Sequence, residues 1–216
     1  MASSGNGTAR GMRSSACGAL LAALLLCAIP FTASRAAAQS VDRFGTIDPS
    51  GEWRNETGAL SLMLAGDALS FSYSAVFGAS AHICDGAGVA GLVEGNIYHF
   101  VDAEGTIAFE ITTDTVRMRV IDGIPSFCGA GWTGAVYLRA NFHPPRRCTV
   151  TARRSRFHVV MRSPPHARTG YVVAGNILET APAQHEDAAS YVLARYRGKR
   201  ATTAGLLRRR TLSCPE

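Results

Sequence analysis

The sequence of 216 residues lacks the residue spacings that most metal and nucleotide sites require. It has no C-x-x-C pair, its six histidines form no i, i+2 or i, i+4 pair, and no G-x-x-x-x-G-K loop occurs. These absences argue against a zinc centre and a phosphate-binding loop. No carboxylate pair stands out among the scattered acids. The sequence therefore predicts no catalytic residue, no metal and no cofactor.

Long apolar runs are also missing beyond the first forty residues, so no later segment has the length of a membrane-spanning helix. The beginning of the chain has a charged lead with two arginines and an apolar core at 16–29, "ACGALLAALLLCAI". Small residues then precede Gln39. This order is typical of a cleaved secretory signal peptide. We expect residues 1–38 to be removed and the mature protein to be periplasmic or secreted.

Four cysteines remain after that segment: Cys84, Cys128, Cys148 and Cys214. An exported chain meets oxidising conditions, so an even number favours disulfides, and three pairings are conceivable. We favour Cys84–Cys128 and Cys148–Cys214, because each pair lies within one half of the chain. His82 and Cys84 share a strand face and resemble a base and a nucleophile. The expected disulfide and the absence of a helix start for an oxyanion hole argue against a cysteine-dependent hydrolase.

Charge is divided unevenly along the chain. Residues 39–140 carry twelve acids against five arginines, and residues 141–216 carry fourteen basic residues against four acids. The break falls at 141–148, "NFHPPRRC", where two prolines would interrupt any strand. We therefore predict an acidic domain over 39–140, a linker over 141–147 and a basic domain over 148–216.

The acidic half shows the period of two that is typical of β-strands. In 68–77, "ALSFSYSAVF", apolar residues alternate with serines, which predicts a half-buried strand. The segment 59–64 precedes it after a short turn, and 96–123 predicts three strands joined at "DAEG" and "TTDT". In the last of these, Arg117 and Arg119 would point into solvent. No helical stripe of useful length appears, so we predict an all-β fold that begins with an antiparallel meander, as a barrel or a sandwich.

Three motifs of the acidic half resemble a known type of domain. They are "GEWRNETGALSLML" at 51–64, "HICDGAG" at 82–88 and "FCGAGWTGAVYL" at 127–138. They are similar to a small β-barrel domain of bacterial envelope proteins, which is itself similar to the barrels of periplasmic lysozyme inhibitors. The resemblance covers about residues 45–140. It implies a binding module without naming what is bound.

Two motifs of the basic half resemble a bacterial SH3-like domain. They are "RFHVVMRSPPHARTGYVVAGNILETAPA" at 156–183 and "SYVLARYRGKRATTAGLLRRRTL" at 190–212. The resemblance implies a small SH3-like barrel with an aromatic binding face formed by Tyr171, Tyr191 and Tyr196. The groove of that family is usually floored by tryptophans, and the basic half has none. A role as a spacer or an oligomer contact therefore stands beside peptide binding.

Two arginine runs near the ends of the basic half are candidates for one anion-binding surface. The first and last strands of SH3-like barrels are commonly close, so we expect the runs to meet. Exposed charges are screened beyond about 8–10 Å at physiological salt, so only a clustered patch would matter. The members of this basic patch are Arg153, Arg154, Arg156, Arg208, Arg209 and Arg210.

Taken together, these features predict a non-catalytic binding or structural protein of the bacterial cell envelope. The basic half would bind an anionic envelope polymer, and the acidic barrel would meet a cationic protein such as a lysozyme. Neither nucleic acid nor a membrane span is expected. One alternative is an inhibitor of a cationic wall-degrading enzyme. Another is that the opposite charges of the two halves neutralise each other across an intramolecular interface.

Overall fold

The computed structural model describes residues 47–159, 166–185 and 189–215, and in these ranges the protein is all-β. The prediction of an all-β fold is thereby confirmed. The predicted signal peptide, residues 1–38, lies outside the described residues.

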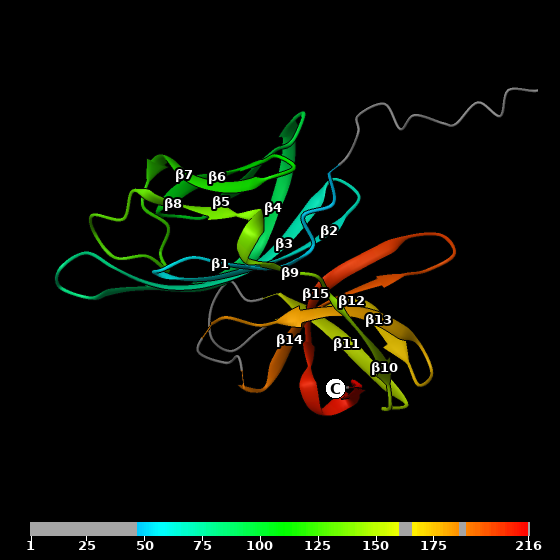
Figure 1. The fold of residues 1–216 in the computed structure, drawn as a ribbon. Coiled ribbons are helices and arrows are strands. Elements are labelled where there is room, and N and C mark those ends of the chain that lie inside the picture. Colours follow the sequence, from blue (N-terminus) through cyan, green and yellow to red (C-terminus); the bar gives the residue numbers. More distant parts are fainter. Residues whose placement is uncertain (1–46, 160–165, 186–188, 216) are drawn as a thin grey trace, which may run out of the picture. The chain divides into compact units, whose positions relative to one another are not determined.

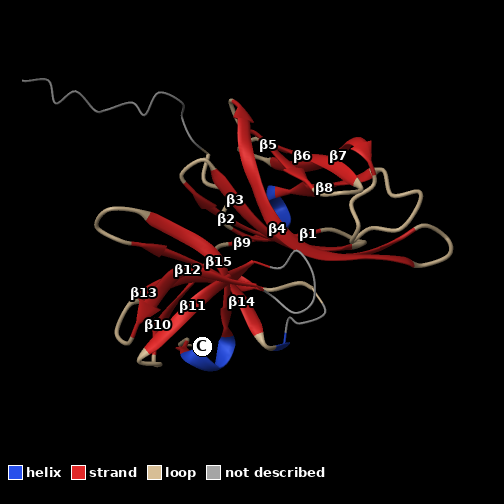
Figure 2. Cartoon of the chain, turned by 180° about the vertical axis from the view of Figure 1, so that it is seen from behind, coloured by secondary structure: helices blue, strands red, loops and turns tan. Residues whose placement is uncertain are grey.

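Helical structure in the described ranges is limited to short 3₁₀ turns (Figure 2). Two of them, η1 (Arg139–Asn141) and η3 (Arg209–Thr211), each lead into a two-residue strand. Within the same ranges, no helix has the length and apolar character needed to cross a membrane.

Nine strands form the first sheet, in the order β8-β7-β6-β5-β4-β3-β2-β1-β9 (Figure 1). All neighbouring strands are antiparallel, and all but β1 and β9 are neighbours in sequence. The strands are β1 (Gly51–Arg54), β2 (Gly58–Ala65), β3 (Ala68–Phe77), β4 (His82–Glu94), β5 (Ile97–Val101), β6 (Gly105–Ile111), β7 (Thr115–Gly123), β8 (Gly134–Leu138) and β9 (Phe142–His143).

This sheet curves into a nearly closed barrel. Strand β9 follows β8 through η1 and pairs with β1 at Glu52 and Trp53. On the same seam, Asn55 Nδ2 donates a hydrogen bond of 3.1 Å to the Val136 carbonyl of β8. The two ends of the meander are therefore held together by one short strand and one side chain.

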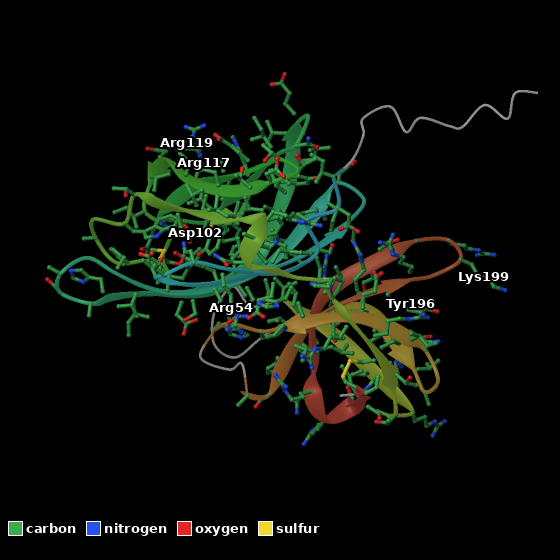
Figure 3. All side chains as sticks on the ribbon, viewed as in Figure 1. Arg54, Asp102, Arg117, Arg119, Tyr196 and Lys199 are labelled. Atoms are coloured by element: carbon green, nitrogen blue, oxygen red, sulfur yellow. A yellow bond between two sulfur atoms is a disulfide. The ribbon has the colours of Figure 1, made fainter. Side chains whose placement is uncertain are left out.

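The meander confirms the strands predicted from period-two patterns. Strands β5, β6 and β7 fill the predicted segment 96–123, and they turn at "DAEG" and "TTDT". Val116 and Met118 are buried, whereas Arg117 and Arg119 between and beside them are exposed (Figure 3). The apolar face of these strands fills the barrel, because alternate side chains of a strand point to opposite sides.

Seven strands form the second sheet, in the order β12-β11-β15-β14-β13-β10-β16. This sheet is a half-barrel. Its concave core contains Phe157, Val172, Leu178 and Leu207 among other buried residues. The strands are β10 (Arg146–Val150), β11 (Arg154–Val159), β12 (His166–Val173), β13 (Ile177–Pro182), β14 (Tyr191–Arg197), β15 (Thr202–Arg208) and β16 (Leu212–Ser213).

The chain passes from the first sheet to the second at Pro144 and Pro145, between β9 and β10. Besides this covalent connection, the two sheets contribute residues to one buried apolar cluster, which we call the shared cluster. Its members are Met63 and Ala87 of the first sheet, with Ala181, Ala183, Tyr191, Leu193, Ala204 and Leu206 contributed by the second part of the chain. A contact with a buried apolar centre explains why residues 41–216 form one compact unit.

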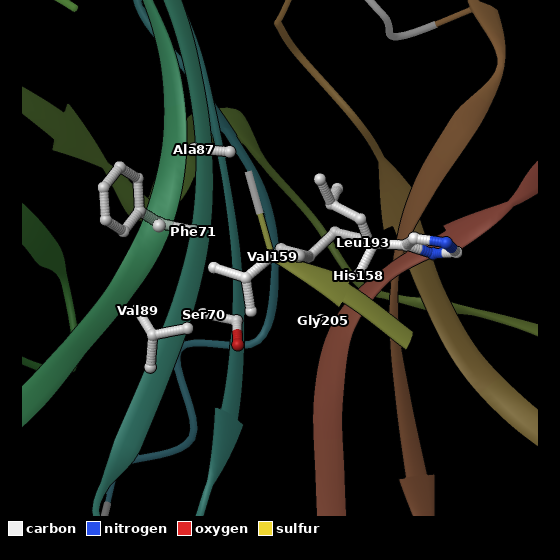
Figure 4. Close-up of a pocket in the computed structure, with 10 residues that line it drawn as sticks. Ser70, Phe71, Ala87, Val89, His158, Val159, Leu193 and Gly205 are labelled. Atoms are coloured by element: carbon white, nitrogen blue, oxygen red, sulfur yellow. The ribbon is translucent and has the colours of Figure 1, made fainter. Parts of the chain in front are cut away.

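Packing at this contact is close. Figure 4 shows a cavity whose lining includes Ser70 and Ala87 from the first sheet and His158, Leu193 and Gly205 from the second. The volume of about 10 Å³ is at the lower limit for one water molecule. The outer face of β3 and β4 is therefore covered around Ser70 and Ala87.

The prediction of a half-buried strand at 68–77 is wrong in one respect. Leu69, Phe71 and Tyr73 face the barrel core as expected, but Ser70 and Ser72 on the other face are also buried. Gln184, which follows β13, donates its backbone N–H to Ser72 Oγ at 2.7 Å. Small hydroxyl side chains let the second sheet approach closely while their polar atoms stay hydrogen-bonded.

Both predicted disulfides are confirmed: Cys84 is bonded to Cys128, and Cys148 to Cys214. The first fastens the loop between β7 and β8 to β4, where Phe127 of that loop packs against Gly86. The second joins β10 to the segment after β16. Each bond lies within one sheet and its loops, as the position of the cysteines suggested.

Candidate functional site

The six residues of the basic patch are all exposed and lie at one end of the second sheet. Arg153 precedes β11, while Arg154 and Arg156 lie on β11. Arg208 ends β15, and the remaining two, Arg209 and Arg210, form most of the 3₁₀ turn η3.

Hydrogen bonds bring the two arginine runs side by side. Thr151, just before the first run, donates its N–H to the Thr211 carbonyl at 2.9 Å. The hydroxyls of Ser155 and Thr211 lie 3.0 Å apart, and Thr211 Oγ1 also donates to the Arg208 carbonyl at 2.6 Å. The Cys148–Cys214 disulfide is close to these bonds, because β10 and β16 pair at Val150 and Leu212. The runs are 55 residues apart in sequence from 153 to 208, yet they share one edge.

Two arginines of the patch lie close to one residue pair of strands β11 and β15. These strands are antiparallel and pair at His158 and Leu206. The charges of Arg156 and Arg208 both act on His158, so the two arginines lie near this pair. Like charges that are close together on a sheet are destabilising. An anion between them would remove that repulsion.

Two tyrosines extend this pair of arginines across four strands. Arg156 pairs with Tyr171 of β12, and Arg208 pairs with Tyr191 of β14. Directly opposed residues of antiparallel strands point to the same face. We call Tyr171, Arg156, Arg208 and Tyr191 the cross-strand row.

His158 lies next to the row and responds to both of its charges. Burial lowers the pKa of His158, and the charges of Arg208 and Arg156 lower it further against the opposing effect of backbone hydrogen bonds. The ring is edge-on to Tyr191, with 5.5 Å between ring centres. Its buried Nδ1 has no hydrogen-bond partner among the described residues. The histidine is therefore held neutral at neutral pH, and the positive charge of the surface comes from arginine alone.

The structure separates the three tyrosines of the predicted aromatic face. Tyr171 is 51% exposed, and the guanidinium carbon of Arg154 lies 3.9 Å from the centre of its ring. Tyr191 is buried in the shared cluster. Tyr196 packs on the opposite side of β14, against the core of the half-barrel. Only Tyr171 offers an accessible ring at the basic patch, and Arg154 already covers one face of it.

Two arginines that the sequence did not single out form ion pairs with Asp48, before β1, and with Glu179 of the second sheet. Arg195 is 3% exposed and bonds Glu179 at 2.6 Å and Asp48 at 3.0 Å. Arg197 contacts the same two carboxylates at 3.2 and 3.1 Å. Burial raises the pKa of Asp48, but hydrogen bonds from Arg195 and Ser50 outweigh this effect and the net shift is downward.

These pairs bear on the idea that opposite charges of the two halves cancel. In the part of the chain that the structure describes, no carboxylate pairs with the following members of the basic patch: Arg153, Arg154, Arg156, Arg208 and Arg210. Neutralisation across the interface is therefore carried by Arg195 and Arg197. A signal for Arg195 was present in "YVLARYR", where it alternates in step with Leu193 on the face that turns out to be buried.

The alternatives of a cysteine nucleophile and a metal site gain no support. Cys84 is in a disulfide, so the pairing of His82 with a free thiol does not occur. Across residues 47–159, 166–185 and 189–215, no three histidine, cysteine or carboxylate side chains come together as a metal site would require.

Comparison with protein family models, with curated proteins and with solved structures finds no match to this chain.

Proposed function

We propose that this protein is a non-catalytic, exported binding protein of the bacterial cell envelope, whose second sheet binds an anionic polymer through the basic patch. The observation that carries the proposal is that Arg156 and Arg208 lie near the same residue, His158, as two exposed guanidinium groups with no carboxylate partner among the described residues. Guanidinium groups bind carboxylate, sulfate and phosphate groups through paired N–H donors.

Three features support the further parts of this proposal. Two disulfides are typical of proteins that fold outside the cytosol. The strand motifs around Tyr171 and Tyr191 favour an SH3-like identity for the half-barrel, with the nearly closed barrel as a second binding module. The exposed face of Tyr171 adds a flat contact at the edge of the patch.

Binding to a defined polyanion tests the proposal. The folded, disulfide-bonded protein would be titrated with dextran sulfate over a salt series, with neutral dextran as the matched ligand control. The variant Arg156→Gln/Arg208→Gln should lose about 30-fold in affinity at low salt, because each arginine contributes ~1 kcal/mol at an anionic surface.

The matched control variant is Arg117→Gln/Arg119→Gln, which removes two exposed arginines from β7 of the first sheet. It should retain the affinity of the unaltered protein. Equal losses of affinity in both variants would mean that binding depends on the net charge of the protein and not on the basic patch. An affinity that does not change with salt would rule out an electrostatic binding surface.

A further inference from the structure

A second pocket, away from the basic patch, lies at the mouth of the first barrel. The side chains that matter in it are Leu64, Asp67, Leu92 and Tyr98 of the first sheet with Arg197 and Thr202 of the second. We call it the mouth pocket. Its volume of about 340 Å³ is in the range of small-molecule sites, which are common at barrel mouths and between packed modules.

One lining residue of the mouth pocket is Tyr98, a nearly buried tyrosine of β5. Tyr98 is 3% exposed, and its ring belongs to the barrel core. No hydrogen bond joins its hydroxyl to another of the described residues, although it lines the pocket. Buried tyrosine hydroxyls usually find a partner. The Tyr98 hydroxyl is not fully enclosed by the protein, so it is free to form a hydrogen bond with a ligand in the pocket.

The charges around the pocket favour a cation. Burial raises the pKa of Tyr98, and the negative charges of Asp67 and Asp48 raise it further, so both carboxylates act on its hydroxyl. Arg195 and Arg197 are already paired with Asp48 and Glu179.

Asp67 is left as the carboxylate in excess. It stands in the exposed turn between β2 and β3 and has no ion-pair partner among the described residues. Lys199 and Arg200 follow Arg197 in an exposed turn, where solvent and salt weaken their effect on the pocket.

We propose that the mouth pocket binds a small primary alkylammonium compound. Its N–H groups would donate to the Asp67 carboxylate and the Tyr98 hydroxyl, and its alkyl chain would pack on Leu64 and Leu92. This inference goes beyond the binding of an anionic polymer, because it concerns a different site, a different ligand charge and none of the residues of the basic patch.

The ligand arm of the test uses three probes of one length. Titration of the folded protein with n-pentylammonium, pentan-1-ol and pentanoate would be followed by calorimetry or by ligand-observed NMR. Binding of n-pentylammonium should be at least about tenfold tighter than that of the alcohol, the size expected for hydrogen bonds to a charged group. Pentanoate should not bind. Equal binding of the alcohol, or tighter binding of pentanoate, would overturn the proposal.

The protein arm uses three conservative variants. Asp67→Asn should weaken n-pentylammonium binding about tenfold and Tyr98→Phe about two- to tenfold, since one removes a charged acceptor and the other a neutral one. Asp122→Asn, in an exposed position of β7, serves as the matched control and should bind as the unaltered protein does. Thermal unfolding of each variant separates lost binding from lost folding. Unchanged affinity in Asp67→Asn would show the assignment to be wrong.

Discussion

Asp48 and Arg195 join the segment before β1 to the second sheet through an ion pair. The Asp48 carboxylate accepts bonds from Nη1 and Nη2 of Arg195 at 3.1 and 3.0 Å. Nε donates to Glu179, and Nη1 also reaches Ser50 Oγ and the Leu64 carbonyl. A buried arginine is tolerated here because every part of it is hydrogen-bonded.

Replacement of this arginine should destabilise the whole unit. Arg195→Ala removes the buried one of the two arginines that pair with Asp48 and Glu179. It also leaves Ser50 and the Leu64 carbonyl without their donor, so we expect a loss of about 3 kcal/mol in the free energy of unfolding. Urea denaturation measures it. Arg200→Ala, at an exposed turn, is the control and should stay within about 0.5 kcal/mol. A loss below about 1 kcal/mol for Arg195→Ala would mean that the two sheets are held by apolar contact alone.

The same pair predicts how stability depends on pH. The pKa of Asp48 lies below its ordinary value of 3.8 in the folded protein. A carboxyl group with a lowered folded pKa contributes stability above its unfolded pKa, and the contribution is lost as the pH falls through the folded value. The urea concentration at the midpoint of unfolding should therefore decrease as the pH is lowered below about 4.

The Asp48→Asn variant isolates this effect from that of other carboxyl groups. It should be less stable than the unaltered protein near neutral pH, and the difference between the two should shrink as the pH falls below 4. If the stability curves of the two proteins stayed parallel throughout the acid range, the pH dependence would belong to other groups, such as Asp102. Burial raises the pKa of Asp102, but the hydrogen bonds that its carboxylate accepts outweigh this effect and lower it.

Much of the first sheet was accessible to sequence reasoning because its pattern is local. Strand β7 alternates apolar and charged residues in a way that can be read without knowledge of any other strand. The two disulfides followed from the even number of cysteines and their division between the halves. The barrel seam at Asn55 and Val136 could not be foreseen, since it depends on the curvature of all the strands between them.

The contact between the two sheets could not be predicted from the sequence, for a different reason. Ser72 alternates like a solvent-facing residue, and its partner Gln184 is 112 residues away. Arg195 belongs to the same contact, and its arginine-rich surroundings concealed it. For the candidate site, the two arginine runs could be identified, but the proximity of Arg156 and Arg208 depends on the pairing of β11 with β15, which composition does not reveal.

The Cys148–Cys214 disulfide should contribute to polyanion binding as well as to stability. Removing it as Cys148→Ala/Cys214→Ala opens a loop with a sequence separation of 66 residues, and the chain-entropy model gives a loss of ~4 kcal/mol. The strand ends that carry the basic patch would also be freed, so dextran sulfate binding should weaken. Both quantities would be measured at a low temperature at which far-UV circular dichroism shows native structure.

The other disulfide supplies the matched control. Cys84→Ala/Cys128→Ala opens a separation of 44 residues, and the logarithmic dependence on loop length makes its expected cost similar. It lies in the first sheet, so polyanion binding should be unchanged. Equal losses of binding in the two variants would show that the Cys148–Cys214 disulfide acts on global stability only.

Two glycines of strand β4 provide the last prediction, on how the β7–β8 loop is held. A Cβ added at Gly86 would collide with the atoms of Phe127 nearest to its backbone, including the Phe127 Cβ at 2.6 Å. The ring cannot turn away freely, because it also packs 5.8 Å from Phe100 and 5.9 Å from Phe71, measured between ring centres. Gly86→Ala should therefore cost about 1–3 kcal/mol, the range for overpacking.

Gly91 lies on the same strand with open space around the added Cβ. Gly91→Ala should stay within about 0.5 kcal/mol of the unaltered protein, or stabilise it slightly by restricting the unfolded chain. Urea denaturation compares the two variants directly, and a fluorescence change at Trp132, a residue of the same loop that is buried in the barrel core, should accompany the loss in Gly86→Ala. If both substitutions had the same small effect, Phe127 would not be the group that fixes the loop to the barrel.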